Sequence, residues 1–440
     1  MKKRLLAALL SSALVMTTLA GCSSKSGSSD MVTELTEPIT IEMWHYMNGG
    51  QADALNSIIE DFNATNDKGI TVNAISQGSI VDLNKKVISA AQSNSLPAII
   101  NVYPDIATGL IEDKKLVNLS SFINDKNVGM ADEMDDFVDS FIQETSQWNN
   151  GEVYGLPMTK STEVLYVNKN MLESLGYTLE DLEGLTFEKL AEISNKAVTE
   201  LGVAGFGFDS SSNAFISSLK MDGLDFVDSK GTINVDNEWV REYMTFFQKQ
   251  AESGAFRIAG EDKFLSNPFV NQKMLCYQGS SAGYAYLNNG GAFEIAVVEV
   301  PVFEGKDKAV MQQGASLFVT NNVSAEAQYA AYEFVKFATN AENTAKFATA
   351  TGYLPVRKSA VETEIVKNIL NDETSLYSQV YNVAQKSLPY SYYTPAINNA
   401  QSARTVAQEK YEAFMSGSIK DVEVLVDDIV SQVQTSIGRN

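Results

Sequence analysis

Residues 39–102 alternate short apolar runs with amphipathic segments, and this order constrains the fold more than any other feature of the chain. Residues 39–44 alternate apolar and polar side chains as a half-buried strand does, and residues 70–74 and 97–102 are the next two apolar runs. Between these runs, apolar residues recur at helical spacing at Leu55, Ile58, Ile59 and Phe62, and then at Leu83, Val87, Ala90 and Ala91. This βαβαβ order predicts a doubly wound α/β lobe with parallel strands.

A second group of elements follows the apolar run at residues 164–167. Helical spacing is present at residues 187–201, 239–251, 327–338, 403–414 and 422–437, and apolar strand-like runs at 274–277, 295–300 and 315–319. A chain of about 420 residues after processing is too long for one compact lobe. We therefore expect an α/β protein of two lobes.

The N-terminus has the pattern of a secretion signal that ends in a lipid-attachment site. Three basic residues precede the apolar run of residues 5–19, which leads into Leu19-Ala20-Gly21-Cys22. The run is shorter than the ~20 residues of a membrane-spanning helix and contains serine and threonine. We predict a signal peptide at residues 1–21, lipid on the sulfur of Cys22, and a flexible tether at residues 22–36. This places the protein on the outer face of the cell membrane.

Charge and cysteine content exclude several classes of partner. The formal net charge of −22 disfavours binding to nucleic acid and to anionic lipid surfaces. If Cys22 carries lipid, Cys276 has no intramolecular disulfide partner, so the fold must depend on its hydrophobic core.

One motif resembles the nucleophile turn of a hydrolase. Gly279-Ser280-Ser281-Ala282-Gly283 fits G-x-S-x-G and follows a predicted strand. In that fold the catalytic histidine comes after the serine, whereas the only histidine of this chain is His45, far upstream. The segment is therefore either a structural turn or a ligand contact.

Other catalytic and cofactor motifs do not occur in the sequence. A single histidine is too few for most zinc sites, and no Gly-rich phosphate-binding motif opens a helix. The acidic run at residues 132–136 lacks the ligand spacing of a calcium loop, and no pair of carboxylates stands out for glycoside hydrolysis. We predict no catalytic residues, no metal and no cofactor.

Several short motifs, in this order and spacing, resemble the extracellular solute-binding proteins of family 1 that serve ABC importers of sugars and polyols. They extend over the whole mature chain, and their positions are residues 39–45, 155–157, 164–169, 314–317 and 351–356. The resemblance implies a periplasmic-binding-protein-like fold of class II, with two doubly wound lobes joined by a hinge. Lobe 1 would contain residues 37–166 and 317–355, and lobe 2 residues 167–316 and 356–440.

The same resemblance implies a function and partners. The protein would be a monomer that captures a small solute, a sugar, oligosaccharide or polyol phosphate, between the lobes and delivers it to ABC permease subunits. Ligand would close the lobes by a hinge motion. The alternative of another class is an extracellular glycosidase or esterase on the same lipid anchor.

One branch of the family, which binds glycerol 3-phosphate, is similar enough to imply individual contacts. Ser161, Gly314, Tyr353 and Arg404 fall where that branch places ligand contacts, and Ser280 or Ser281 lies near another. The chain departs from the branch at Ile80, where a tyrosine is expected, and at Pro104, where an acid is expected. The resemblance therefore leaves open whether the solute is a glycerol phosphate or a different polyol.

The remaining candidates lie beyond predicted strand ends, where ligands of open α/β sheets bind. Trp44, His45 and Tyr46 end the first strand and could stack on a sugar, pack in the core or lie at the hinge between the lobes. Tyr103 and Asp105 follow the third strand, and Asp105 could accept hydrogen bonds from hydroxyl groups. Phe208 and Asp209 complete the set from the second lobe, whereas the tyrosines at 390, 392 and 393 could pack on a lobe surface or line the site.

Overall fold

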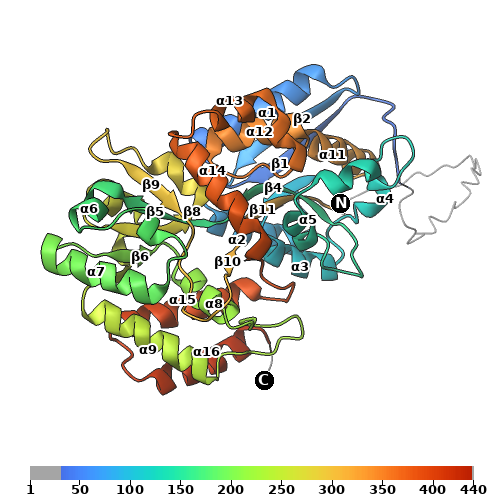
Figure 1. Ribbon diagram of the computed structural model, residues 1–440. Helices are drawn as coiled ribbons and strands as arrows, with labels where there is room; N and C mark the ends of the chain where they lie inside the picture. Colours follow the sequence, from blue (N-terminus) through green and yellow to red (C-terminus); the bar gives the residue numbers. More distant parts are fainter. Residues whose placement is uncertain (1–30, 439–440) are drawn as a thin grey trace, which may run out of the picture. The chain divides into compact units, whose positions relative to one another are not determined.

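The computed structural model describes residues 31–438. The predicted signal peptide, the lipidation residue Cys22 and residues 22–30 of the predicted tether lie outside the described residues. Residues Val32–Asn440 form one compact unit, which contains two separate five-stranded sheets (Figure 1). We call each sheet with its packed helices a lobe.

Lobe 1 is built on a mixed sheet with the strand order β2-β1-β3-β11-β4. β1 pairs in parallel with both β2 and β3, whereas β11 runs antiparallel to β3 and β4. The strands are β1 (Ile39–His45), β2 (Ile70–Ser76), β3 (Ile99–Val102), β4 (Gly155–Ser161) and β11 (Gln313–Val319). All of β3 is buried, as its apolar sequence predicts for a central parallel strand.

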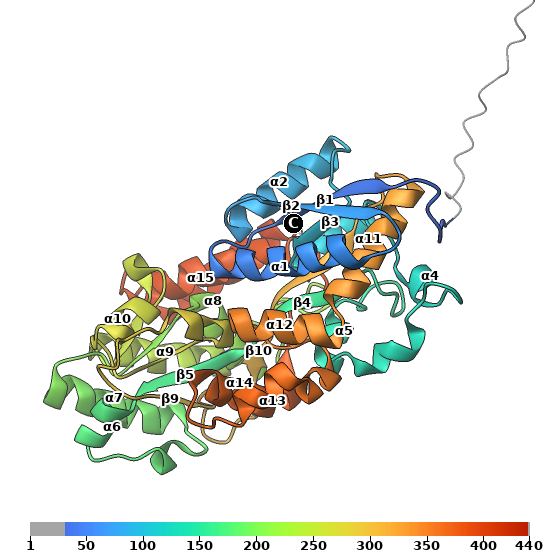
Figure 2. The same ribbon diagram turned by 90° about the horizontal axis from the view of Figure 1, so that it is seen from above.

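Helices cover the sheet of lobe 1, and α1 and α12 lie side by side (Figure 2). They are α1 (Gly50–Thr65), α2 (Ile80–Gln92), α3 (Pro104–Glu112), α11 (Ala325–Ala338) and α12 (Ala341–Thr351). The buried residues of α1 and α2 are the eight that the sequence periodicity predicted. α3 begins where Pro104, which has no N–H to satisfy, occupies the first turn.

Lobe 2 has the strand order β7-β6-β8-β5-β9. The strands are β5 (Glu163–Asn168), β6 (Phe206–Phe208), β7 (Phe256–Ile258), β8 (Cys276–Ser280) and β9 (Ile295–Val298). Its main helices are α7 (Phe187–Leu201), α8 (Ser211–Lys220), α9 (Glu238–Glu252), α14 (Leu376–Ser387), α15 (Ala400–Met415) and α16 (Val422–Ser436). An aromatic cluster fills the core, in which the rings of Phe187 and Phe303 are 4.5 Å apart.

Shorter elements connect these parts. The short helices are α4 (Ser120–Ile123), α5 (Asp139–Glu144), α6 (Lys169–Ser174), α10 (Ser266–Val270) and α13 (Glu364–Leu370), and a two-stranded sheet pairs β10 (Val310–Met311) with β12 (Ser391–Tyr392). The 3₁₀ helices are η1 (Ala131–Asp136), η2 (Glu180–Leu182), η3 (Gly260–Asp262), η4 (Ser281–Tyr286), η5 (Lys358–Glu362) and η6 (Leu388–Tyr390). No helix within residues 31–438 is both long and apolar enough to cross a membrane.

The chain passes between the lobes earlier than the sequence predicted. All of β5 pairs with strands of lobe 2, and all of β11 pairs with strands of lobe 1. The first two crossings are therefore at Thr162 and Gln312, not at 166/167 and 316/317.

The third crossing comes later than predicted. The expected return to lobe 2 was at residue 356, but Arg357 stays on lobe 1, where its guanidinium lies 3.9 Å from the ring centre of Phe137 and donates to the Glu133 carbonyl. α13 packs against α12, and α14 is the next helix, which reaches the sheet of lobe 2 at β9 and β5.

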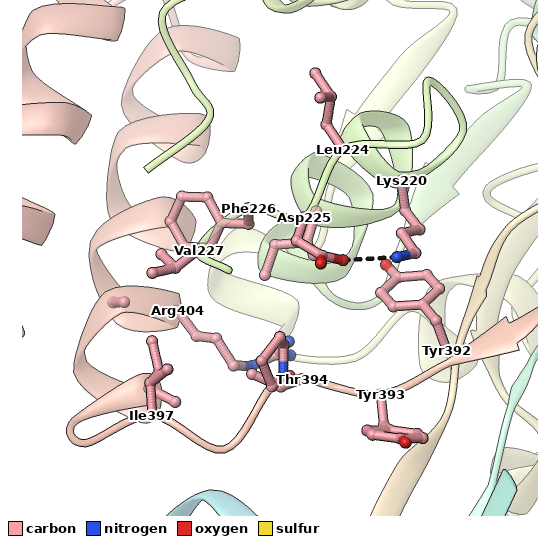
Figure 3. Close-up of a pocket in the computed structure, with 14 residues that line it drawn as sticks. Lys220, Leu224, Asp225, Phe226, Val227, Tyr392, Tyr393, Thr394, Ile397 and Arg404 are labelled. Carbon is pink, nitrogen blue, oxygen red and sulfur yellow. Dashed lines mark hydrogen bonds and ion pairs between the residues drawn. The ribbon is translucent and has the colours of Figure 1, made fainter. Parts of the chain in front are cut away.

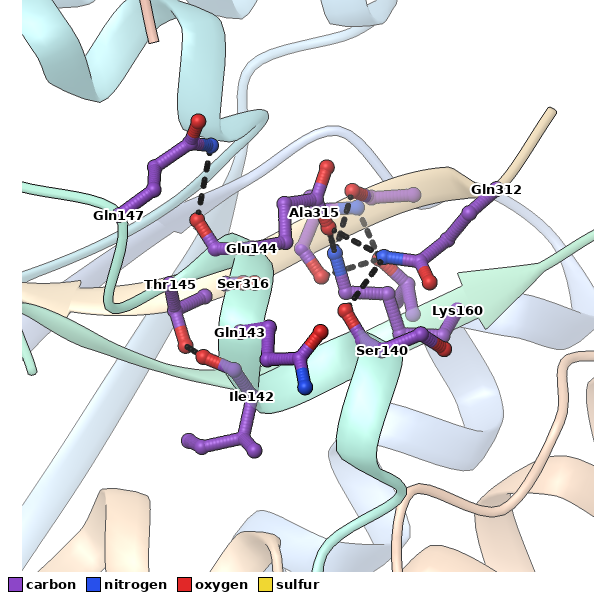
Figure 4. Close-up of polar contacts among 12 residues, drawn as sticks. Ser140, Ile142, Gln143, Glu144, Thr145, Gln147, Lys160, Gln312, Ala315 and Ser316 are labelled. Carbon is purple, nitrogen blue, oxygen red and sulfur yellow. Dashed lines mark hydrogen bonds and ion pairs between the residues drawn. The ribbon is translucent and has the colours of Figure 1, made fainter. Parts of the chain in front are cut away.

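A buried polar network joins the first two crossings (Figure 4). Lys160, at 0% exposure, forms an ion pair with Glu144 of α5, and its Nζ also donates to the Gly314 carbonyl at 3.1 Å. Gln312 Nε2 donates to the same Glu144 carboxylate at 2.9 Å and to the Ser140 carbonyl at 3.2 Å. One carboxylate therefore holds both crossing segments in place.

Gly314 is required beside this network. Its φ of +114° is in the left-handed region, and a Cβ there would lie 1.6 Å from the Thr159 carbonyl oxygen. Only glycine lets the second crossing approach β4 this closely.

We predict that Lys160→Met lowers the free energy of unfolding by about 3–5 kcal/mol, because it leaves the Glu144 charge buried without a partner. The double variant Lys160→Met/Glu144→Leu should recover much of that loss, since neither charge then remains. Urea unfolding followed by circular dichroism measures both effects.

The control is Lys358→Met, which removes one partner of the exposed Lys358–Asp139 ion pair and should change stability little. Equal stability losses for Lys160→Met and Lys358→Met would contradict a structural role for the buried pair.

Candidate functional site

The candidate site lies where the ends of strands from both sheets face each other. β1, β3 and β4 of lobe 1 end at this edge, and β6 and β8 of lobe 2 end opposite, where β5 begins. Ligands of open α/β sheets bind beyond the carboxyl ends of strands. Ser280 at the end of β8 donates a hydrogen bond of 3.1 Å to Ser161 Oγ at the end of β4, so the two edges meet.

Tyrosine hydroxyls gather at the edge of lobe 1. The Tyr46 hydroxyl lies 3.1 Å from Thr159 Oγ1 and 3.3 Å from the Tyr353 hydroxyl. Burial raises the pKa of Tyr46, Tyr103 and Tyr353, and Tyr46 adds to this rise for Tyr103 and for Tyr353. These side chains therefore offer neutral hydroxyl groups at any physiological pH.

The structure separates the predicted aromatic contacts of β1. Trp44 lies on a face of the sheet beside α2, where Lys86 sits 5.0 Å over its ring. His45 is 3% exposed, and its Nδ1 accepts a hydrogen bond from the Met47 N–H at 3.1 Å. The role of Trp44 and His45 as ligand contacts stays a prediction, whereas Tyr46, the next residue, brings its hydroxyl to the group of tyrosines described above.

The hydroxyl groups at the first crossing form a compact cluster. Ser281 is fully buried, and its Oγ accepts a hydrogen bond of 3.4 Å from the Thr162 N–H. The Tyr166 hydroxyl donates to the carbonyls of Ser280 and Ser281 at 2.9 and 3.1 Å. The structure thus brings Ser161, Ser280 and Ser281 together, and their role as ligand contacts stays a prediction.

Arg404 extends from the N-terminal part of α15 and is held by α8. Its Nη2 donates to Asn213 Oδ1 at 2.5 Å and to Ser212 Oγ at 3.3 Å. α8 starts there because the Ser210 side chain caps it by accepting from the Asn213 N–H at 3.2 Å. Arg404 also borders a cavity of about 20 Å³ beside Tyr392 and Thr394 (Figure 3), which is large enough for a single water molecule.

Asn213 links Arg404 to a buried carboxyl group. Asn213 Nδ2 donates to Glu163 Oε1 at 2.8 Å, and Gln278 Nε2 donates to Glu163 Oε2 at 2.9 Å. Burial raises the pKa of Glu163, and the positive charge of Arg404 partly offsets that rise. Sequence reasoning missed Glu163, Asn213 and Gln278, which become neighbours only in the folded protein.

Two further carboxyl groups lie at the strand ends. Asp105 follows β3, and one of its oxygens accepts the Ile106 N–H at 2.7 Å; burial raises its pKa, while Arg404 opposes the shift. Asp209 follows β6, and one of its oxygens accepts the Leu265 N–H at 2.5 Å. Burial raises the pKa of Asp209 to about 7.

Phe208 is not at the site. It is 2% exposed, and its ring packs 4.6 Å from that of Phe206 in the core of lobe 2. Strand alternation explains the difference, because adjacent residues point to opposite faces and only Asp209 leaves the strand at its end. Within residues 31–438, no cluster of three or more histidine, cysteine or acidic side chains could hold a metal ion.

The raised pKa of Asp209 predicts a pH-dependent stability difference. A carboxyl whose folded pKa exceeds its unfolded value of 3.8 costs stability as the pH rises from about 4 to about 7, and the full cost remains above pH 7. Asp209→Asn should therefore stabilise the protein by roughly 1–3 kcal/mol at pH 8 and change little at pH 4. Thermal unfolding of both proteins at the two pH values tests this, and an equal effect at both would contradict it.

Comparisons with known proteins agree with this architecture. A family model described as bacterial extracellular solute-binding protein matches residues 57–371. The sn-glycerol-3-phosphate-binding periplasmic protein UgpB of Rhizobium meliloti is 22% identical over 414 residues, covering 90% of this chain and 94% of the relative. UgpB of Escherichia coli K12 is 23% identical over 393 residues, covering 86% and 88%.

Solved structures share the fold. UgpB from Mycobacterium tuberculosis in complex with glycerophosphocholine has a TM-score of 0.79 at 21% identity, covering 92% of this chain and 99% of that one. The cyclic alpha-maltosyl-1,6-maltose binding protein from Arthrobacter globiformis has a TM-score of 0.75 at 18% identity, covering 92% and 100%. The resemblance seen in the sequence is confirmed: the chain belongs to the bacterial extracellular solute-binding protein family.

Proposed function

We propose that the protein is the substrate-binding component of an ABC importer and binds a carbohydrate or polyol solute between its two lobes. The observation that carries this proposal is the convergence of polar side chains from both lobes on one site. Ser280 of lobe 2 and Ser161 of lobe 1 are joined by a hydrogen bond of 3.1 Å, and α15, which carries Arg404, packs against α3, which carries Asp105. A small solute placed there would touch both lobes. The partners would be the solute and the permease subunits, and the protein would act as a monomer.

The site also favours binding over catalysis. Ser281, the nucleophile position of the hydrolase-like motif, has its Oγ buried and engaged by the Thr162 N–H. Both oxygens of Glu163 accept hydrogen bonds from side-chain amides, which leaves this carboxyl poorly placed for proton transfer. These contacts support a binding role over the alternative of a glycosidase or esterase.

Contacts between the lobes support closure around a solute. The Ala396 N–H donates to Gln147 Oε1 at 2.7 Å, and Asn398 Nδ2 donates to the Glu112 carboxylate. On the η4 side of the interface, the Tyr284 hydroxyl donates to the Thr349 carbonyl at 3.2 Å. These bonds require the lobes to be close, so a solute that touches both lobes would favour the same arrangement.

A second candidate solute is glycerol 3-phosphate or a glycerophosphodiester. The printed names of the UgpB relatives and of the glycerophosphocholine complex favour it, and Arg404 supplies a basic group at the site. The other solved structures are of proteins for oligosaccharides such as cyclic maltosyl-maltose and cycloalternan, which favour an uncharged sugar.

We further propose that Cys22 carries a lipid that anchors the protein to the outer face of the cell membrane. The support is the sequence alone, in which a basic start and an apolar run precede Leu19-Ala20-Gly21-Cys22.

We predict that a panel of sugars, oligosaccharides and glycerol phosphates includes a ligand that raises the melting temperature of the protein. That ligand should reduce the radius of gyration in small-angle scattering, because it favours the closed arrangement of the lobes. Reproducible turnover of a glycoside or ester would contradict the receptor function. A bound ligand with an unchanged radius at saturation would contradict hinge closure.

We predict that Cys22→Ala abolishes incorporation of a clickable fatty acid, because the thioether bond needs this sulfur. Cys276→Ala is the matched control and should label normally, since Cys276 is buried in lobe 2. Equal labelling of the wild type and Cys22→Ala would refute the anchor.

A further inference from the structure

We infer that Glu163 is a positioning residue, which acts through Asn213 to set the direction in which the Arg404 guanidinium faces the site. This inference rests on the proposed function, because Arg404 stays a predicted contact of the solute. It follows from the order of hydrogen-bond donors and acceptors along these three side chains.

Asn213 lies between a group that can only donate and a group that can only accept. Arg404 Nη2 donates to Asn213 Oδ1 at 2.5 Å, and Asn213 Nδ2 donates to Glu163 Oε1 at 2.8 Å. A guanidinium has no acceptor, and a carboxylate has no donor. Because Asn213 is fully buried, turning its amide over would leave donor against donor at Arg404 and acceptor against acceptor at Glu163. Only one orientation of this amide therefore satisfies both neighbours.

The Glu163 carboxylate is itself held in place. It is 2% exposed, and its second oxygen, Oε2, accepts a hydrogen bond from Gln278 Nε2 at 2.9 Å. Burial raises the pKa of Glu163, whereas both amide bonds and the charge of Arg404 oppose that shift and favour the acceptor-only form. Glu163 also begins β5, directly after the crossing at Thr162, and pairs with Ser280 of β8. The carboxylate is therefore a fixed reference point between the crossing and α8.

The direction of the Arg404 guanidinium depends mainly on Asn213. Its second bond, from Nη2 to Ser212 Oγ, is longer at 3.3 Å. Within residues 31–438, its Nε and Nη1 have no hydrogen-bond partner in the protein, and the side chain is only partly buried. These N–H groups remain available to a solute, so the direction of the guanidinium matters for binding. Glu163, whose two oxygens are both occupied, would act on the solute through Arg404 alone.

The first test measures how fast the Arg404 guanidinium rotates, by ¹⁵N NMR of the solute-free protein, with Arg404→Lys used to identify its signal. We expect Glu163→Met to speed the rotation by about fivefold or more, which corresponds to the loss of a hydrogen bond worth about 1 kcal/mol. Glu163→Gln should change it by less than about twofold, because the new amide keeps an oxygen for Asn213. Gln278 can turn its unpaired Oε1 toward the new N–H group.

Two controls separate this role from a general loss of structure. Glu252→Met removes an exposed glutamate at the end of α9 in the same lobe and should leave the rotation of Arg404 unchanged. The signal of Arg241, which is ion-paired in that lobe, should stay the same in every variant. Equal rotation in Glu163→Met and the wild type, or equal acceleration in Glu163→Met and Glu163→Gln, would overturn the inference.

A double variant tests the order of donors and acceptors. Asn213→Asp places two buried carboxyl groups against each other and should lower the midpoint of urea unfolding. Adding Glu163→Gln should restore most of that loss, because an amide N–H then faces the new carboxylate, while Glu163→Gln alone should cost little. Additive effects of the two substitutions would contradict the proposed order.

Binding of a probe connects the orientation of Arg404 to function. Calorimetric titration with maltose and with sn-glycerol 3-phosphate uses one uncharged and one charged probe. A probe that binds the wild type should bind Glu163→Met about fivefold or more weakly, and Glu163→Gln within about twofold. Unchanged binding by Glu163→Met would overturn the positioning role. Failure of both probes to bind the wild type would count against the proposed function, whereas the rotation of Arg404 still decides the inference.

Discussion

The buried ion pair between Lys160 and Glu144 is the interaction on which the arrangement of the site depends. It lies where the chain first passes between the sheets, and Gln312 of the second crossing shares the same carboxylate. Two segments about 150 residues apart in the chain are therefore held by one acidic side chain. Ser161 and Thr162 come directly after Lys160 in the chain, and Gly314 lies two residues after Gln312. The anchored residues therefore position the segments where the strand ends of the two lobes meet.

The two basic side chains near the site are both bound to other groups of the protein. Lys160 is used to join the crossings, and Arg404 donates to Asn213, which donates in turn to Glu163. The relatives named for glycerol 3-phosphate have the same fold at 21–23% identity, a level at which the backbone is retained while side-chain chemistry changes. Shared architecture therefore identifies the fold, whereas the choice of solute depends on the side chains of the site.

The elements with regular apolar spacing could be predicted from the sequence, whereas the site could be predicted only in part. The buried faces of α1 and α2 follow from local periodicity, and so they matched residue by residue. β4 was not predicted as a strand because Pro157 and Lys160 interrupt its apolar pattern. Lys160 is tolerated in the protein interior because Glu144 of α5 forms an ion pair with it. Trp44, His45 and Tyr46 were predicted together, since the end of a strand cannot be fixed to one residue by pattern. Of the three, Tyr46 has its hydroxyl beside Thr159 and Tyr353.

The partners of Arg404 could not be predicted from local sequence patterns either. Asn213 lies 191 residues away in the chain, and no local signal connects the two. Gly314, Tyr353 and the serines were predicted from resemblance to a family, which carries information about three-dimensional neighbours that spacing lacks.

The bonds that join the lobes at Gln147, Glu112 and Thr349 have a consequence for how long a solute stays bound. Together with the bond between Ser280 and Ser161, they are the hydrogen bonds described above between the lobes, and Glu112 and Asn398 lie at the exposed rim, where water competes for each partner. The closed arrangement would therefore be only slightly favoured in free energy when no solute is bound. The contacts that the solute makes with the protein would then mainly set how long the solute stays bound. Such a receptor would release its solute when a transporter separates the lobes, because few contacts between the lobes themselves oppose opening.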